Sequence, residues 1–136
     1  MTRLVLPYPP TNNHRLTVAR GRAISSADYR RWRQEAGYAL LSQHPRKVPG
    51  KVVVMVELCP PDKRLRDLDN VGFKGILDLL VEHGVIDGDD GRYVREISAR
   101  WRDNGDPCAV TVAPASDERS AFFLEHEAEM FKGVSA

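Results

Sequence analysis

Apolar and polar residues alternate along the chain with two different periods, and these periods predict strands and helices. Apolar runs predict strands at residues 3–8 and 52–58. The second run is apolar at nearly every position, which is typical of a central strand covered on both faces. Two short runs at residues 16–25 flank a glycine and predict a hairpin. Alternation over residues 93–101, the turn "RDNGDP" and an apolar run at 108–113 predict a second hairpin.

Three segments have the spacing of amphipathic helices. The first is expected from about Ser26 to Gln43, and its core face is Tyr29, Trp32, Ala36 and Leu40. The second is expected over residues 69–83, where Gly84 is a natural helix stop. Its buried stripe would be Phe73, Ile76, Leu77 and Leu80. The tail from Asp117 to Val134 predicts a third helix, which would dock on the body or on a second subunit.

The order of these elements indicates one α+β domain, with a mixed or antiparallel sheet and helices packed on it. A length of 136 residues and a hydrophobic fraction of 42% are ordinary for a single globular domain. No apolar stretch approaches the roughly 18 residues of a membrane span, and prolines interrupt the N-terminus too early for a signal peptide. We therefore expect a cytoplasmic protein that does not engage a membrane. Cys59 and Cys108 are interpreted as small buried residues.

Charge is distributed unevenly along the chain. Residues 1–66 carry 13 Lys and Arg against 4 Asp and Glu, a net charge of +9, whereas residues 67–136 carry 7 against 15, a net charge of −8. A basic half beside an acidic half is compatible with self-association, or with a polyanion held beside a metal site. Composition alone does not choose between the two.

The stretch "RDLDNVGFKGILDLLVEHGVIDGDD" places acidic residues on both sides of the second helix. Asp67 and Asp69 precede it, and Asp87, Asp89 and Asp90 follow it. Asp67 and Asp69 can face one point if the segment is extended. The helix would be about 22 Å long, so the later aspartates reach the earlier ones only if the chain doubles back after Gly84.

Carboxylates that converge in this way would need a cation among them. Oxygen-only ligands favour Mg²⁺ or Mn²⁺, and such an ion activates water and stabilises the charge that develops on a phosphate. Lys74 is the nearest cation in the sequence, and Arg64 and Arg66 could hold a phosphate backbone. The plainer alternatives are a helix cap, a solvated turn and a surface Lys74–Asp78 ion pair. An EF-hand is excluded, because glycine and glutamate are missing at the required positions after Asp87.

Four stretches resemble the RusA family of Holliday junction resolvases, which are endonucleases common in phages and prophages. They are "LPYPPTNNHR", "RGRAISSADYRRWR", "PDKRLRDLDN" and "HGVIDGDDGRYV". The resemblance spans about Leu6 to Val112 and implies a RusA-like nuclease domain at residues 1–115, with a helical extension at 116–136. The implied activity is Mg²⁺-dependent cleavage of opposed strands of a four-way junction by a homodimer, with Mn²⁺ as a possible substitute. The implied setting is DNA recombination, repair or phage DNA processing in a bacterial cytoplasm.

The resemblance also assigns roles by position. Asp67, Asp69 and Asp90 become metal ligands, Asp89 is the neighbouring acid, and Lys74 is the catalytic lysine that stabilises the phosphate or the leaving group. Asp87 ranks third among the later aspartates. DNA contacts are implied, by the resemblance and by positive charge, for Asn12, Asn13, Arg15, Arg20, Arg22, Arg30, Lys63, Arg64 and Arg66.

One departure from the family pattern concerns the lysine. The family places its lysine three residues after the motif asparagine, whereas Lys74 stands four after Asn70. The extra residue is expected in the first turn of the helix, at residues 71–73. Two other functions stay open: a branched-DNA-binding protein without catalysis, and a nuclease that acts on flaps or forks. Retention of three acids together with the lysine argues against the first of these.

Overall fold

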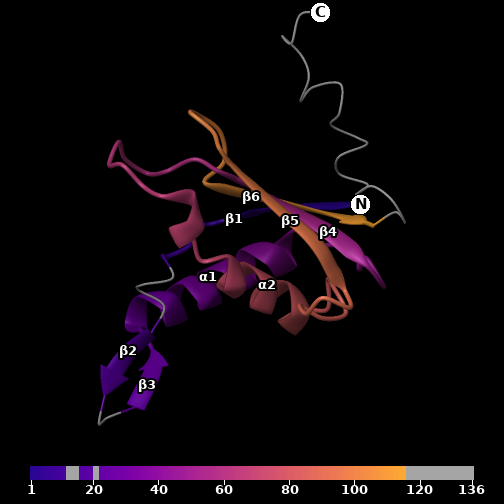
Figure 1. Cartoon of the computed structure of the whole chain (residues 1–136), viewed down its shortest axis with the longest axis horizontal. Helices are drawn as coiled ribbons and strands as arrows, with labels where there is room; N and C mark the ends of the chain where they lie inside the picture. The colour runs from indigo at the N-terminus through magenta and orange to yellow at the C-terminus, as the bar shows by residue number, and fades with distance from the viewer. Residues whose placement is uncertain (12–15, 20–21, 116–136) are drawn as a thin grey trace, which may run out of the picture.

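A four-stranded sheet with two helices on one face forms the body of the protein (Figure 1). The structure, a computed structural model, describes residues 1–11, 16–19 and 22–115, and it describes the backbone alone for residues 16–19 and 22–25. The strand order is β1-β6-β4-β5. These strands are β1 (Thr2–Leu6), β4 (Val52–Leu58), β5 (Val94–Trp101) and β6 (Cys108–Pro114). A mixed α+β domain was predicted from the sequence and is confirmed.

The sheet is antiparallel except at one edge. β6 pairs antiparallel with both β1 and β4, and β5 pairs parallel with β4. The predicted hairpin between β5 and β6 is therefore wrong, because β4 lies between these two strands. Burial explains the arrangement: β6 is buried at every position except its last, which suits an interior strand, whereas β5 is half-exposed or exposed throughout and takes the edge.

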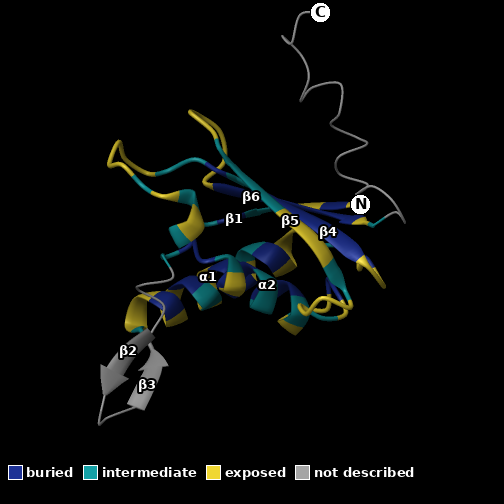
Figure 2. Ribbon diagram, viewed as in Figure 1, coloured by how far each residue is buried: buried dark blue, intermediate teal, exposed yellow. Residues whose placement is uncertain are grey.

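Helices α1 (Ala27–Ser42) and α2 (Phe73–Glu82) cover the same face of the sheet, and the separate hairpin of β2 (Leu16–Ala19) and β3 (Arg22–Ser25) projects past the start of α1 (Figure 1). The Ser26 hydroxyl caps α1 by accepting from the Tyr29 amide at 3.0 Å. The predicted core face of α1 is confirmed, since Tyr29, Trp32, Ala36 and Leu40 are all buried. The buried residues lie on the strands of the sheet and on the helix faces turned toward it (Figure 2).

The second helix begins four residues later than predicted. Leu68–Asn70 forms a separate 3₁₀ turn, η2, and α2 starts only at Phe73. Two contacts with the N-terminal segment break the helix here. Val71 forms an isolated antiparallel bridge with Thr11, and Gly72 lies so close to Pro10 that a Cβ would stand 2.4 Å from its carbonyl oxygen.

The buried side of α2 also differs in detail from the prediction. Ile76 and Leu80 are buried as predicted, Phe73 and Leu77 are only partly buried, and Leu79 is fully buried although it was not in the predicted stripe. Gly84 has a φ of 71°, so the predicted helix stop is confirmed. Cys108 is buried, which raises the pKa of its thiol to about 12, while Cys59 is half-buried.

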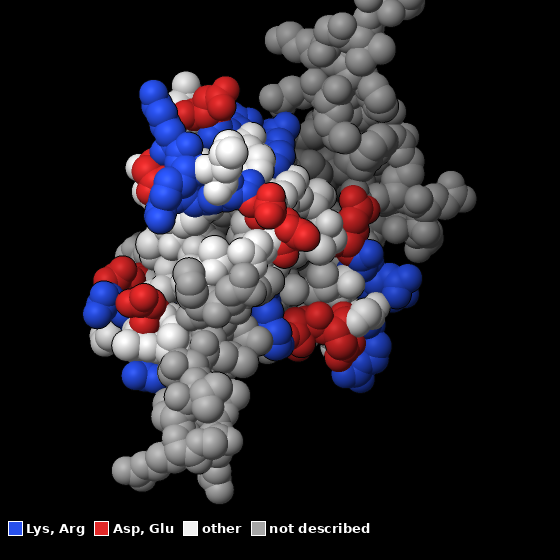
Figure 3. Space-filling model, turned by 60° about the vertical axis from the view of Figure 1, so that its left-hand side comes forward, with Lys and Arg blue, Asp and Glu red and all other residues white. Residues whose placement is uncertain are grey.

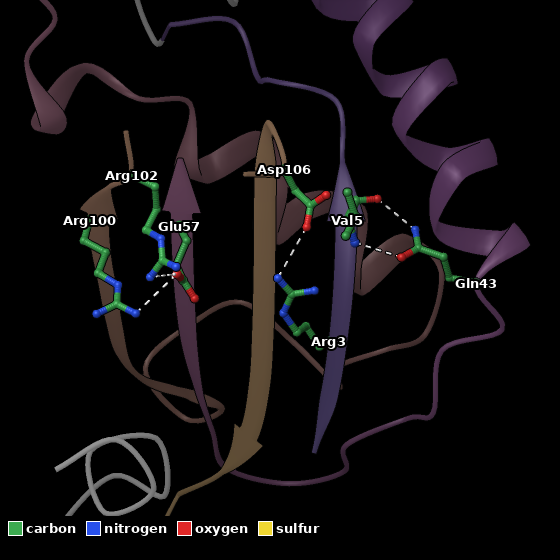
Figure 4. A network of polar contacts seen from close by, with 7 residues as sticks. All are labelled: Arg3, Val5, Gln43, Glu57, Arg100, Arg102 and Asp106. Atoms are coloured by element: carbon green, nitrogen blue, oxygen red, sulfur yellow. Dashed lines mark hydrogen bonds and ion pairs between the residues drawn. The ribbon is translucent and has the colours of Figure 1, made fainter. Parts of the chain in front are cut away.

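The face and edge of the sheet turned away from the helices carry polar side chains (Figure 4). Glu57 on β4 accepts from Arg100 at 3.3 Å and from Arg102 at 2.9 Å. At the β1 edge, the Gln43 side chain accepts from the Val5 amide and donates to the Val5 carbonyl, each at 2.8 Å. Among the described residues no helix combines the length and apolarity needed to cross a bilayer. The predicted C-terminal helix lies outside the described residues.

Candidate functional site

The chain doubles back after α2 and brings Asp89 beside the start of that helix. Lys74 is the second residue of α2, and Asp89 lies seven residues after the helix ends. Even so, Lys74 Nζ is 3.7 Å from Asp89 Oδ2. Val85 and Ile86, which are buried in the core, anchor the returning segment. The chain thus returns after Gly84 as far as Lys74, and the approach of the later aspartates to Asp67 stays a prediction.

Lys74 forms ion pairs with two carboxylates through its ammonium group. Its Nζ donates to Asp78 Oδ1 at 3.2 Å, one turn further along α2, and faces Asp89 across the return. Its side chain remains 57% exposed, so the ammonium group is held in place and can still reach a ligand from solvent. Of residues 71–73, which were expected in the first turn of the helix, only Phe73 belongs to α2, and Val71 and Gly72 precede it.

Asp67 and Asp69, here called the acidic pair, are exposed and unpaired. Asp67 has an extended backbone, but Asp69 lies within η2, so the extended geometry assumed from the sequence holds for Asp67 alone. Asp67 makes no side-chain capping bond to η2, and the N-cap of α2 is Gly72. In the described part of the chain, neither carboxylate has a hydrogen-bond or ion-pair partner. The helix-cap alternative is therefore wrong for both.

Asp87, Asp89 and Asp90, here called the acidic turn, are each paired. Asp87 accepts from the Gly50 amide at 2.8 Å and from Lys47 at 2.8 Å, and these two bonds lower its pKa. Asp90 accepts from the side chain and the backbone amide of Arg92, and these bonds lower the pKa of Asp90 to about 2. Asp89 faces Lys74. All three carboxylates are therefore compensated by positive charge or by a backbone N–H.

The acidic residues fit a metal ion through the type of their donor atoms more than through their number. Among the described residues, no three His, Cys, Asp or Glu side chains are gathered closely enough to hold a metal on their own. The donor set nevertheless suits Mg²⁺, which is commonly held by one or two carboxylates together with water and substrate phosphate oxygens. Two exposed carboxylates without a counter-charge satisfy that requirement. The third carboxylate named from the sequence, Asp90, stays a prediction.

The segment between β4 and η2 forms a basic loop that an internal carboxylate organises. Asp62 accepts from the Arg64 amide at 2.9 Å and pairs with the guanidinium groups of Arg64 and Arg66. The Arg64 amide and side chain lower the pKa of Asp62 to about 2. Arg66 also donates to the carbonyls of Asp62 and Arg64, and its guanidinium lies 5.8 Å from the centre of the Tyr8 ring. The loop is thus braced in one conformation.

A cleft of about 570 Å³ lies beside this basic loop. Asp67 and Asn70 lie on its wall, so the cleft opens next to the acidic pair. The lining of the cleft holds as many carboxylates as guanidinium groups, and Trp101 of β5 supplies an aromatic surface; the charged residues are Arg31, Arg64 and Arg66 against Asp28, Glu35 and Asp67. Figure 3 shows Lys and Arg side chains gathered at the top of the view, around the end of the molecule that carries the loop after β4. The acidic pair therefore adjoins the basic loop, whose exposed Lys63 and Arg64 suit a polyanion.

The other residues predicted to contact DNA are distributed over the molecule. Lys63 and Arg64 are exposed in the basic loop, and Arg66 is half-buried there. Arg30 lies on α1 beside Arg33, away from the main cleft. The structure gives the backbone of Arg22 in β3, and Asn12, Asn13, Arg15 and Arg20 lie outside the described residues. Their roles stay predictions.

Sequence reasoning missed several residues of this surface. Tyr8 and Leu65 were not assigned to the site, yet both line the cleft. Tyr8 sits in a proline-rich segment that gave only a strand prediction, and Trp101 ends the predicted strand at residues 93–101. Trp101 does pack against the core, but its side chain is half-buried and also faces the cleft. Because these residues come from separate elements, no local pattern reveals their proximity.

The fold is a small α+β domain that carries exposed carboxylates next to a basic loop, together with a lysine held by two further carboxylates. The chain belongs to the family described as endodeoxyribonuclease RusA, whose model matches residues 7–113, more than half of its length. The resemblance noted in the sequence is thereby confirmed. Membership implies an endonuclease that acts on Holliday junctions. No curated protein matches the chain.

Proposed function

We propose that the chain is a Mg²⁺-dependent, structure-selective endonuclease that resolves four-way DNA junctions as a symmetric homodimer. The proposed setting is recombination, repair or phage DNA processing in a bacterial cytoplasm. One observation supports this most strongly: Asp67 and Asp69 are exposed next to the basic loop and have no partner among the described residues, while Lys74 is held 3.7 Å from Asp89. Exposed carboxylates without counter-charges repel one another, and a divalent cation would relieve that repulsion.

The roles follow from these surroundings. Asp67 and Asp69 would hold Mg²⁺, with Asp90 as the third carboxylate, and Asp89 would keep Lys74 in place. When bound, the ion would activate a water molecule and stabilise negative charge on the scissile phosphate. Lys74 would bring its ammonium group to the phosphate or to the leaving oxygen. Hydrolysis forms one oxygen–phosphorus bond with water and breaks another, and the leaving oxygen acquires a proton.

The surface chemistry supports DNA as the substrate. Lys63 and Arg64 are exposed in the basic loop, and Arg31 adds a third cation on the cleft wall. Contacts between such side chains and phosphates release counterions, so binding should weaken steeply as salt concentration rises. A flat salt response would contradict the assignment of this surface to DNA.

The test compares cleavage of a synthetic four-way junction, a matched linear duplex and a flap, each with and without Mg²⁺. Paired symmetric nicks in the junction alone, dependent on Mg²⁺ and absent in Asp69→Asn, are the expected result. Tight junction binding without cleavage in Mg²⁺ or Mn²⁺ would contradict the proposal, and preferred cleavage of the flap would change the substrate. Sedimentation of the protein alone and with the junction tests the dimer.

A further inference from the structure

Leu65 stands out among the apolar side chains of the described surface. Its relative exposure is 102%, compared with 67% for Tyr38 and 52% for Leu41. A single exposed leucine needs no explanation by itself. Leu65, however, lies between Arg64 and Arg66 in the basic loop, two residues before the acidic pair begins. An apolar side chain at this place would meet DNA at the same time as the two arginines.

The cleft behind Leu65 offers a surface on which a flat ring can stack. Leu65, Tyr8 and Trp101 line it together with four prolines. The Arg66 guanidinium lies over the Tyr8 ring, 5.8 Å from its centre, as in a cation–π contact. Nucleobases stack on aromatic rings and on guanidinium planes, and Asn70 adds an amide that can bond to a base edge. A volume of about 570 Å³ falls in the range of sites for small organic groups.

The loop that carries Leu65 is held in position. The side chain of Arg66 is only 16% exposed, and it bonds to the carbonyls of Asp62 and Arg64 at 3.2 Å and 3.0 Å. Asp62 in turn bonds to the Arg64 amide. Because these contacts hold the backbone on both sides of Leu65, little ordering of the loop is left to be done on binding. An apolar side chain on such a loop can separate stacked bases.

We propose that the cleft binds one unstacked nucleobase of the branched DNA, and that Leu65 is the wedge that displaces this base. Proteins that open base steps commonly insert an apolar side chain between them. The base would stack in the cleft beside Tyr8 and Trp101, while Arg64 contacts the adjoining phosphate. Asp67 lies on the same cleft wall, so the displaced nucleotide would be held next to the proposed metal site. This inference rests on the proposed function, because it names how that site engages its substrate.

The test places the fluorescent base 2-aminopurine at each position next to the branch point of a four-way junction, one position at a time. Ca²⁺ replaces Mg²⁺ so that the DNA remains intact. The wild-type protein is expected to raise the fluorescence severalfold at one position, because an unstacked 2-aminopurine is no longer quenched. Leu65→Ser should abolish the rise with little change in affinity, since phosphate contacts dominate affinity. Leu65→Met should retain it.

Two controls separate a wedge from a general effect on the surface. Leu41→Ser removes another exposed leucine, which lies near the end of α1 and does not line the cleft, and it should leave the rise unchanged. Tyr8→Phe keeps the ring and should retain the rise, whereas Tyr8→Leu should reduce it. Thermal unfolding of each variant shows whether it is folded.

The outcomes also separate this inference from the proposed function, because cleavage of the same junctions is measured in Mg²⁺. If the wild type cleaves but gives no rise, or if folded Leu65→Ser gives the wild-type rise, the base-binding cleft is wrong and the nuclease assignment stands. A Leu65-dependent rise without cleavage would support the cleft and overturn the nuclease. Failure of the wild type to bind the junction would overturn both.

Discussion

The acidic pair before α2 and the acidic turn after it contain the same side chain in opposite electrostatic surroundings. Asp67 and Asp69 have no partner among the described residues, although a basic loop directly precedes them. The arginines of that loop bond instead to Asp62. In the acidic turn, by contrast, Asp87, Asp89 and Asp90 pair with Lys47, Lys74 and Arg92. Two carboxylates are thus left available for a cation, while the acidic turn is compensated within the protein.

This difference shows that acidic density in a sequence does not by itself locate a metal site. The acidic turn is the denser cluster, yet Asp87 serves mainly to fasten the loop before β4 through Gly50 and Lys47. Asp62, which sequence reasoning overlooked, frees the acidic pair by engaging Arg64 and Arg66. Which carboxylates can bind a metal therefore depends on how the cations between them are distributed.

The largest expected effect comes from removing one charge in each cluster. Asp69→Asn should slow junction cleavage by at least roughly 100-fold, the scale seen when one group that stabilises a transition state is lost. Asp87→Asn should cost much less, because its carboxylate is engaged by Gly50 and Lys47. Single-turnover cleavage rates measure both. Equal losses would mean that the two clusters do not differ in function.

A second comparison concerns the cleavage rates of variants at Asp89 and Asp90, which are neighbours in the acidic turn. Asp90→Asn should match Asp69→Asn if Asp90 is the third ligand. Asp89→Asn should reduce the rate on the order of 10-fold, the lower end of the range for groups that orient a catalytic partner. Loss of the Asp89 carboxylate leaves Asp78 as the remaining ion-pair partner of Lys74 among the described residues. If the order of the two effects is reversed, the ligand role passes to Asp89.

Glycines near the two clusters provide a test of stability. A Cβ at Gly72 would meet the Pro10 carbonyl oxygen at 2.4 Å, whereas a Cβ at Gly91 meets nothing within 4 Å. Gly72→Ala should lower the free energy of unfolding by about 1–3 kcal/mol, as for other overpacked sites. Gly91→Ala should change it by less than about 0.5 kcal/mol. Urea unfolding followed by circular dichroism gives both values, and similar values would show that the N-terminal segment does not fix the start of α2.

The smallest effect concerns the ionisation of Asp90. Hydrogen bonds from Arg92 lower the pKa of Asp90 from 3.8 to about 2. The stabilisation from this pair is therefore present above about pH 3.8 and is lost as the pH falls through about 2. Arg92→Ala should return the pKa toward 3.8, which a carboxyl-carbon NMR titration measures. An unchanged pKa would show that Arg92 does not hold Asp90 in solution.

Local elements of the fold were predictable from the sequence, and contacts between distant segments were not. Helix α1, with its Ser26 cap, and the buried strand β4 follow from patterns within one segment. The place of β6 between β1 and β4 depends on competition among strands, which no local pattern records. The late start of α2 has the same origin, because Thr11 and Pro10 impose it from the other end of the domain.

The candidate site divides in a similar way. The residue types and the need for the chain to return after Gly84 were evident, because helix length and the positions of the aspartates are sequence properties. The pairing of each carboxylate was not, since Lys47 and Asp87 are forty residues apart and meet only in the fold. The cleft is likewise assembled from the N-terminal segment, α1, the basic loop and β5.

The Gln43 side chain has a consequence for how this sheet can associate. A primary amide presents one acceptor and a donor group, and Gln43 uses them on Val5 as a neighbouring peptide group would. It therefore takes the place of one residue of a fifth strand and hinders another strand from pairing with the β1 edge at Val5. At the opposite margin, β5 carries Arg95 and Glu96, whose charges disfavour uncontrolled pairing. At the β1 edge the Gln43 amide occupies hydrogen-bonding groups of Val5, and at the β5 edge charged side chains disfavour pairing. The two edges therefore differ in how readily a strand of a second chain could pair with them.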